Sequence, residues 1–114
     1  MKYVLMFCET EQWEKNWETM DDTAREQGFA RVQAWLAEYG DKILHNRKLS
    51  GGDTATTVRL DAAGGPLVTD GPFVEGKEIV SGYVEVEVAD LDEALGMART
   101  WPGCPLVEIR PVLM

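Results

Sequence analysis

The sequence predicts an α+β fold: a βαββαβ antiparallel sheet covered on one face by two helices. Three observations support this prediction. Short extended segments alternate with two helical segments, the connections between them are brief, and 114 residues suffice for one hydrophobic core. We therefore expect residues 1–114 to form a single domain.

The first strand spans residues 2–8, which are apolar at almost every position. Alternation places its side chains in two sets, Tyr3, Leu5 and Phe7 on one face and Val4, Met6 and Cys8 on the other. A strand that is apolar on both faces needs cover on both. The chain's own helices can supply one layer, and we expect a second subunit to supply the other, in a homodimer.

Two helices have clear start signals. Asp21 or Asp22 caps a helix over residues 21–39, and Asp90 with Glu93 forms a capping box for a second helix that ends before Pro102. The predicted core-facing sides are Phe29, Val32, Leu36 and Tyr39 in the first helix, and Leu91, Leu95 and Ala98 in the second. Between the first strand and these helices, residues 9–18 place Trp13 and Trp17 on one face if that piece is helical.

The remaining extended segments are 43–49, 54–60, 67–69, 79–88 and 106–112. In segment 79–88, the alternation predicts one face of Val80, Val84, Val86 and Val88 and another of Ser81, Tyr83, Glu85 and Glu87. Residues 68–83 are predicted to form a hairpin that leads into a central strand and closes one end of a barrel. Within it, Gly71 and Pro72 make a turn, Phe73 anchors the loop, and Glu75, Lys77 and Glu78 form either a solvated charge run or partners for arginines.

Composition excludes several classes of partner. A net charge of −9 disfavours nucleic acid and anionic membrane surfaces, which require basic patches. No stretch approaches the roughly 20 apolar residues of a membrane span, and the N-terminal run is too short for a signal peptide. Two cysteines suit a reducing compartment, so we expect a cytoplasmic protein. No metal-ligand spacing or cofactor motif is present, and the one histidine, His45, reads as a surface residue.

The sheet face away from the helices is the best candidate site. Strand alternation brings several polar side chains there, and the predicted ligand-binding set is Arg59, Tyr83, Glu85, Glu108 and Arg110. The alternative is that these charges neutralise each other as cross-strand pairs. Asp70 is either a turn residue or a catalytic carboxylate at the barrel mouth. Cys8 ends the first strand and Cys104 precedes the last, which is its expected neighbour, so the two are either buried reduced thiols or a redox pair.

The sequence resembles the DGPF group of YCII-related proteins. The motif is Asp70-Gly71-Pro72-Phe73, followed by Glu75, Lys77-Glu78 and Gly82-Tyr83, and the resemblance covers residues 2–112. It implies a ferredoxin-like domain of the dimeric α/β-barrel superfamily and a regulatory or stress-linked setting beside sigma factors. The histidine and aspartate proposed as an active site in smaller YCII proteins are missing here, because residues 26–31 contain no histidine and residues 98–102 no aspartate.

Two functions remain open from the sequence. The first is a binding protein whose dimer cleft holds a small polar or aromatic molecule. The second is an enzyme that performs acid–base chemistry on a small molecule, with Asp70, Glu85 or Glu108 as proton carrier and Arg59 or Arg110 holding an anion. A third possibility is a protein-interaction subunit without a cleft.

Overall fold

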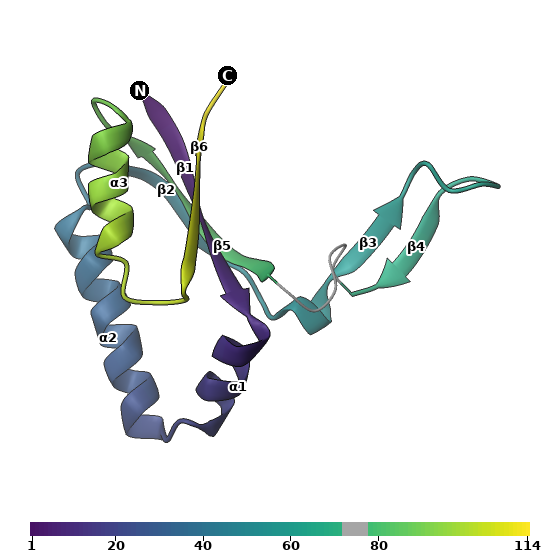
Figure 1. Cartoon of the computed structure of the whole chain (residues 1–114), viewed down its shortest axis with the longest axis horizontal. Helices are drawn as coiled ribbons and strands as arrows, with labels where there is room; N and C mark the ends of the chain where they lie inside the picture. Colours follow the sequence, from purple (N-terminus) through teal and green to yellow (C-terminus); the bar gives the residue numbers. More distant parts are fainter. Residues whose placement is uncertain (72–77) are drawn as a thin grey trace.

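The computed structural model describes residues 1–71 and 78–114 (Figure 1). Its helices are α1 (Glu11–Thr19), α2 (Asp22–Glu38) and α3 (Leu91–Arg99), with a short 3-10 turn, η1 (Gly52–Thr54). Its strands are β1 (Lys2–Thr10), β2 (Ile43–Lys48), β3 (Thr56–Arg59), β4 (Leu67–Asp70), β5 (Glu78–Glu87) and β6 (Leu106–Pro111).

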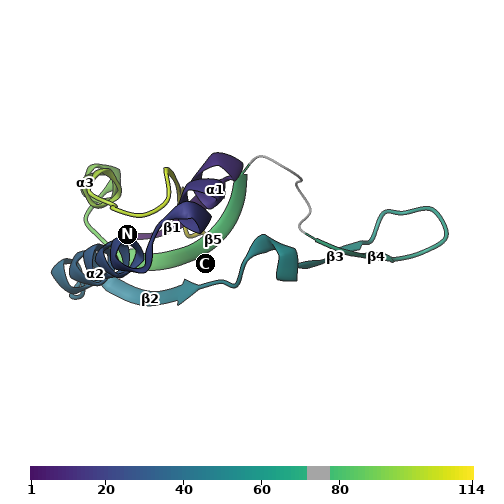
Figure 2. The same cartoon turned by 90° about the horizontal axis from the view of Figure 1, so that it is seen from below.

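The main sheet has four antiparallel strands in the order β2-β5-β1-β6. This is the strand order of a βαββαβ unit, in which both central strands come from the starts of the two halves. The helices lie on one side of the sheet (Figure 2), so the predicted α+β architecture is confirmed. The two-helix prediction was incomplete, because the polar segment with Trp13 and Trp17 forms the separate helix α1. We call the side of this sheet away from the helices the open face.

Each helix begins at a side chain that accepts a backbone N–H. Asp21 Oδ1 accepts from the Ala24 amide at 2.8 Å, and Asp90 Oδ1 accepts from the Glu93 amide at 3.0 Å, so both predicted caps are confirmed. Thr10 Oγ1 caps α1 in the same way. In the described chain, no helix is long and apolar enough to cross a membrane.

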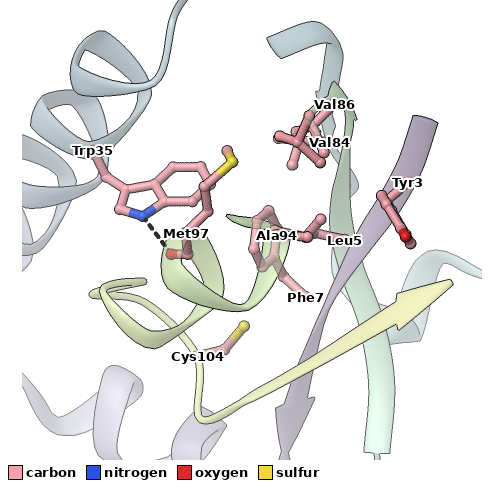
Figure 3. Packing of buried hydrophobic residues seen from close by; sticks show 10 residues of the cluster. Tyr3, Leu5, Phe7, Trp35, Val84, Val86, Ala94, Met97 and Cys104 are labelled. Atoms are coloured by element: carbon pink, nitrogen blue, oxygen red, sulfur yellow. Dashed lines mark hydrogen bonds between the residues drawn. The ribbon is translucent and has the colours of Figure 1, made fainter. Parts of the chain in front are cut away.

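The core lies between the helix-covered face of the main sheet and the helices α2 and α3 (Figure 3). Leu5 and Val86 are fully buried, and Phe7 stacks on Trp101 with a centroid distance of 3.8 Å. Trp35 of α2 donates its indole N–H to the Met97 carbonyl of α3 at 3.1 Å, which ties the two helices together. The apolar set Tyr3, Leu5 and Phe7 is therefore the core-facing one.

Both predicted helix faces are confirmed in part, because Leu36 and Tyr39 of α2 and Ala98 of α3 pack against the core, whereas Phe29 and Leu91 do not. In α2 the buried residue is Trp35, whereas Phe29 is 57% exposed and contacts Trp17 of α1. In α3 the buried residues are Ala94 and Met97, and Leu91 is 47% exposed. The prediction missed Trp35, whose large indole fills the centre of the core and joins α2 to α3.

A β-bulge corrects the alternation predicted for β5. Phe7 pairs with Gly82 but Cys8 pairs with Val80, so Ser81 is the extra residue. The predicted faces exchange there: Ser81 is buried and donates its hydroxyl to the Phe7 carbonyl at 3.2 Å, while Val80 is 42% exposed. The bulge is favoured where it is because this hydroxyl satisfies a buried carbonyl.

β3 and β4 pair only with each other among the described strands, and they extend away from the main sheet (Figures 1 and 2). We call residues 55–71 the arm. The extended segments 54–60 and 67–69 are thus strands, but the predicted hairpin over 68–83 is wrong, because β4 belongs to the arm and β5 to the main sheet. The predictions for Pro72, Phe73, Glu75 and Lys77 fall outside the described residues.

Candidate functional site

The open face is built from side chains that the strand register places in three rows. The first row is His45, Glu85, Val4 and Arg110; the second is Arg47, Tyr83, Met6 and Glu108; the third is Val80, Cys8 and Leu106. Neighbouring strands in a sheet are about 4.8 Å apart, so each row brings its members into side-chain range. These eleven residues define the open-face site.

An apolar stripe runs down the middle of this site along β1. Val4, Met6 and Cys8 are only half-buried although they lie in a central strand, and the flanking Val80 and Leu106 are 42% and 39% exposed. Apolar surface left accessible across several strands is typical of an interface or ligand-binding surface. The open-face site is therefore suited to contact another apolar surface.

Charged groups flank the stripe on both sides. Arg47 and Glu85 come from β2 and β5, and Glu108 and Arg110 come from β6. Within residues 1–71 and 78–114, none of Glu85, Glu108 and Arg110 forms an ion pair with another side chain. The cross-strand neutralisation considered from the sequence is thus absent for these three groups, and they remain able to pair with a ligand or a second chain.

The sequence-predicted site residues fall into two groups. Tyr83, Glu85, Glu108 and Arg110 all lie on the open face. Arg59 lies instead in the arm, where its guanidinium is 3.6 Å from the Asp61 carboxylate. Asp70 ends β4, also in the arm, beside Gly71 at φ = +101°, the positive backbone angle expected of a turn glycine. One chain therefore does not assemble the predicted set, because Arg59 and Asp70 are separated from the open-face site.

Sequence reasoning missed His45 and Arg47. A second register shift, between Ile43 and His45, turns both side chains onto the open face. His45 lies opposite Glu85, and its ring is 5.8 Å from the Tyr83 ring. The irregularity at Leu44 breaks the alternation of β2. The sequence of the strand is therefore only weakly patterned and did not indicate the open face for His45 and Arg47.

The two cysteines lie on different sides of the sheet. Cys104 is buried in the core with its sulfur 3.8 Å from the Ser81 hydroxyl, whereas Cys8 belongs to the open face, and both are free thiols. Burial raises the pKa of Cys8, and the nearby Cys104 and Glu108 raise it further. Burial also raises the pKa of Cys104, against a weaker opposing effect of the hydrogen bond with Ser81. A raised pKa leaves less thiolate at neutral pH, which disfavours nucleophilic or redox use.

The donor set defines the chemistry available on the open face. The described residues contain no group of three or more histidine, cysteine or acidic side chains arranged to hold a metal ion. What the face offers is two guanidinium groups for an anion, two carboxylates for donors, and the rings of His45 and Tyr83 for stacking.

Comparison with known proteins agrees with this architecture. The family model of the YCII-related domain matches residues 1–113, which is nearly the whole chain. The chain belongs to the YCII-related family. An uncharacterised protein of Rhizobium meliloti (strain 1021) is 31% identical over 118 residues, covering 100% of this chain and 94% of the relative. The YCII relationship thus extends over both the main sheet and the arm.

Proposed function

We propose that this YCII-related protein is a homodimeric small-molecule-binding protein in which two open faces oppose each other and enclose a polar-edged cleft. The observation that carries the proposal is the apolar stripe of β1 between charged groups that have no ion-pair partners in the described chain. Two such faces would bury their stripes against each other and leave the charged edges lining the remaining space. We assign residues 1–114 to one domain of this kind.

The edges of the site favour a ligand with a ring and an anionic group. Arg47 and Arg110 present guanidinium groups suited to a carboxylate or phosphate, and Tyr83 with His45 offers an aromatic surface. Glu85 and Glu108 can accept hydrogen bonds from ligand hydroxyl or amino groups. The resemblance to the DGPF group supports a regulatory or stress-linked role, and the two cysteines, both free thiols, suit a cytoplasmic setting.

The test uses native mass spectrometry of the protein as purified from cells. The expected result is a dimer mass with a bound small molecule that is lost on denaturation. Arg110→Ala should lose the bound compound and keep the dimer, because it removes an anion partner at the edge of the face. Ala63→Ser, a small change at the tip of the arm, is the matched control. A wild-type protein that is monomeric and carries no compound would contradict the proposal.

A second candidate, acid–base catalysis on a small molecule, has one specific observation in its favour. His45, the one histidine of the chain, faces Glu85 across β2 and β5, and a histidine beside a carboxylate is a common proton-transferring pair. Incubation with a metabolite extract separates the two functions. An enzyme would consume one compound and form another, and Glu85→Gln would abolish that conversion; a binding protein would return its compound unchanged.

A further inference from the structure

The arm makes the chain more extended than its length requires. The Cα radius of gyration is 16.1 Å, whereas a compact chain of 114 residues has about 13 Å. The accessible surface is 7987 Å², whereas a compact monomer of 12.7 kDa exposes about 6,200 Å². Figures 1 and 2 both show the arm projecting from the side of the body, so the arm accounts for a large part of this difference.

One face of the arm is an apolar stripe. Val58 pairs directly with Val68, which places both on the same side of the ribbon, and Leu60 lies in the turn just beyond β3. The exposed fractions of these side chains are 51%, 62% and 77%. The opposite side carries Arg59 and Leu67, the latter also 50% exposed.

Hydrogen bonds between described residues join the two strands of the arm at its base. At its base the Gly71 amide donates to the Ala55 carbonyl at 2.7 Å, and the Thr57 hydroxyl donates to the Gly71 carbonyl at 2.6 Å. These bonds close the ribbon but bury none of its apolar residues. An isolated two-stranded hairpin is marginally stable in water, so a ribbon with this apolar stripe requires cover from another surface.

We propose that the arm packs on a second copy of this chain, with the Val58–Val68 stripe buried in the dimer. This inference rests on the proposed open-face dimer and adds to it a second contact that each subunit makes with the other. The stripe ends at Asp70, which shares its side of the ribbon, and the open face presents Arg47 as a complementary group. In this arrangement Asp70 pairs with the second subunit and is not the catalytic carboxylate considered from the sequence.

Charge distribution favours a second copy as the occupant. The chain carries −9 overall, so two copies repel each other through most of their surfaces. On the open-face site, Arg47 and Arg110 balance Glu85 and Glu108, and the arm carries only Arg59 against Asp61 and Asp70. The open face and the arm are thus the parts through which two such acidic chains can approach.

The area also fits. The excess exposed surface is about 1,800 Å² per chain relative to a compact monomer, or about 3,600 Å² for two chains. This lies in the range of about 2,000–5,000 Å² buried by permanent homodimers. A weak or transient contact would not require so much uncovered surface.

The test compares the dimer dissociation constant of three variants with that of the wild-type protein by analytical ultracentrifugation. Val68→Asp places a charge in the stripe and should raise the dissociation constant about tenfold or more. Ala63→Asp adds the same charge at the arm's loop, outside the stripe, and should leave it within about twofold. Met6→Asp probes the open face separately. Far-UV circular dichroism of each variant checks that the main sheet and helices remain folded.

The effects of Met6→Asp and Val68→Asp on the dimer distinguish the open-face proposal from the arm proposal. If Met6→Asp dissociates the dimer and Val68→Asp does not, the open-face dimer stands and the arm inference is overturned. If Val68→Asp dissociates it and Met6→Asp does not, the open-face dimer fails, and only the burial of the Val58–Val68 stripe between two copies stands. A monomeric wild-type protein overturns both.

Hydrogen–deuterium exchange of the wild-type protein gives a second readout that needs no substitution. The amides of Thr57, Val58 and Val68 should exchange rapidly in dilute protein and slowly at concentrations where the dimer forms. Equal protection at every concentration would mean that the arm is covered by its own chain, and rapid exchange at every concentration would mean that it is not covered at all. Either result overturns the inference.

Discussion

Leu5 and Met6 are neighbours in β1, yet they lie on opposite faces of the sheet and should respond differently to truncation. Leu5 is fully buried, opposite Val84 and Ile109. Replacing it with alanine removes three heavy atoms from a packed core and should cost about 2–5 kcal/mol of unfolding free energy. For 114 residues the unfolding entropy is roughly 240 cal/mol/K, so a loss of about 3 kcal/mol lowers the melting temperature by roughly 12 °C.

Met6→Ala is the matched control, because it truncates an apolar side chain one residue away. Met6 is half-buried on the open face, so its loss should cost the folded subunit less than about 1 kcal/mol while weakening association. The assay is urea unfolding followed by tryptophan fluorescence at two protein concentrations. Trp35 reports on the core directly, because its ring packs beside Phe7 at 5.9 Å.

The outcome that refutes the assignment of faces is equally definite. If Leu5→Ala costs less than about 1 kcal/mol, or if Met6→Ala destabilises a dilute, monomeric sample as strongly as Leu5→Ala does, then Leu5 is not the core residue of this pair. A shift of the Met6→Ala midpoint that depends on protein concentration, with a Leu5→Ala shift that does not, would support both the core and the open face.

Substitutions at three further positions test local features. Hydrogen bonding between Lys42 and Glu93 raises the pKa of Lys42 above 10.5 and lowers the pKa of Glu93 below 4.5. Urea unfolding of Lys42→Met should therefore show the full loss of stability between pH 4.5 and pH 10.5. The loss should vanish as the pH falls through the lowered pKa of Glu93 or rises through the raised pKa of Lys42. Asp21→Ala should cost about 0.5–2 kcal/mol through loss of the α2 cap, and Asp21→Asn should restore most of it. Ser81→Ala should cost about 1–3 kcal/mol because the buried Phe7 carbonyl loses its hydroxyl donor; Ser81→Thr tests whether a hydroxyl alone suffices.

The parts of the fold that local sequence encodes were predictable. The caps Asp21 and Asp90 follow from side chains that satisfy the next amides, and both are present. The division of β1 into two apolar sets follows from alternation, and the charged open face follows from the register of β5 and β6 beside it. These features depend on residues close together in the chain.

The errors arise where tertiary contacts decide. The bulge at Ser81 depends on the Phe7 carbonyl, 74 residues away in the chain, and it reverses the faces of Val80 and Ser81. Alternation within β5 carries no record of that contact. The rotation of α2 likewise depends on Trp35 meeting Met97, which no pattern within α2 encodes.

The location of Arg59 shows a different limit. The β-branched pattern around Thr57 and Val58 correctly predicts a strand, but the same pattern fits a strand of the main sheet and a strand of a projecting ribbon. Sequence reasoning grouped Arg59 with Glu108 and Arg110 on this account. In the structure Arg59 belongs to the arm, whereas Glu108 and Arg110 belong to the main sheet.

Because each subunit carries a net charge of −9, the salt dependence of dimerisation can distinguish apolar contact from ion pairing as the basis of the proposed interface. Two acidic subunits repel over distances of about 10 Å at 0.1 M salt, and this repulsion is screened within about 3 Å at 1 M. Contact between the apolar stripes is not screened. Dimerisation through the open face and the arm should therefore strengthen as sodium chloride rises, which sedimentation equilibrium can measure. If association weakens instead, ion pairs between the subunits, from groups such as Glu108 and Arg110, dominate the interface, and the apolar stripes are not its main source of stability.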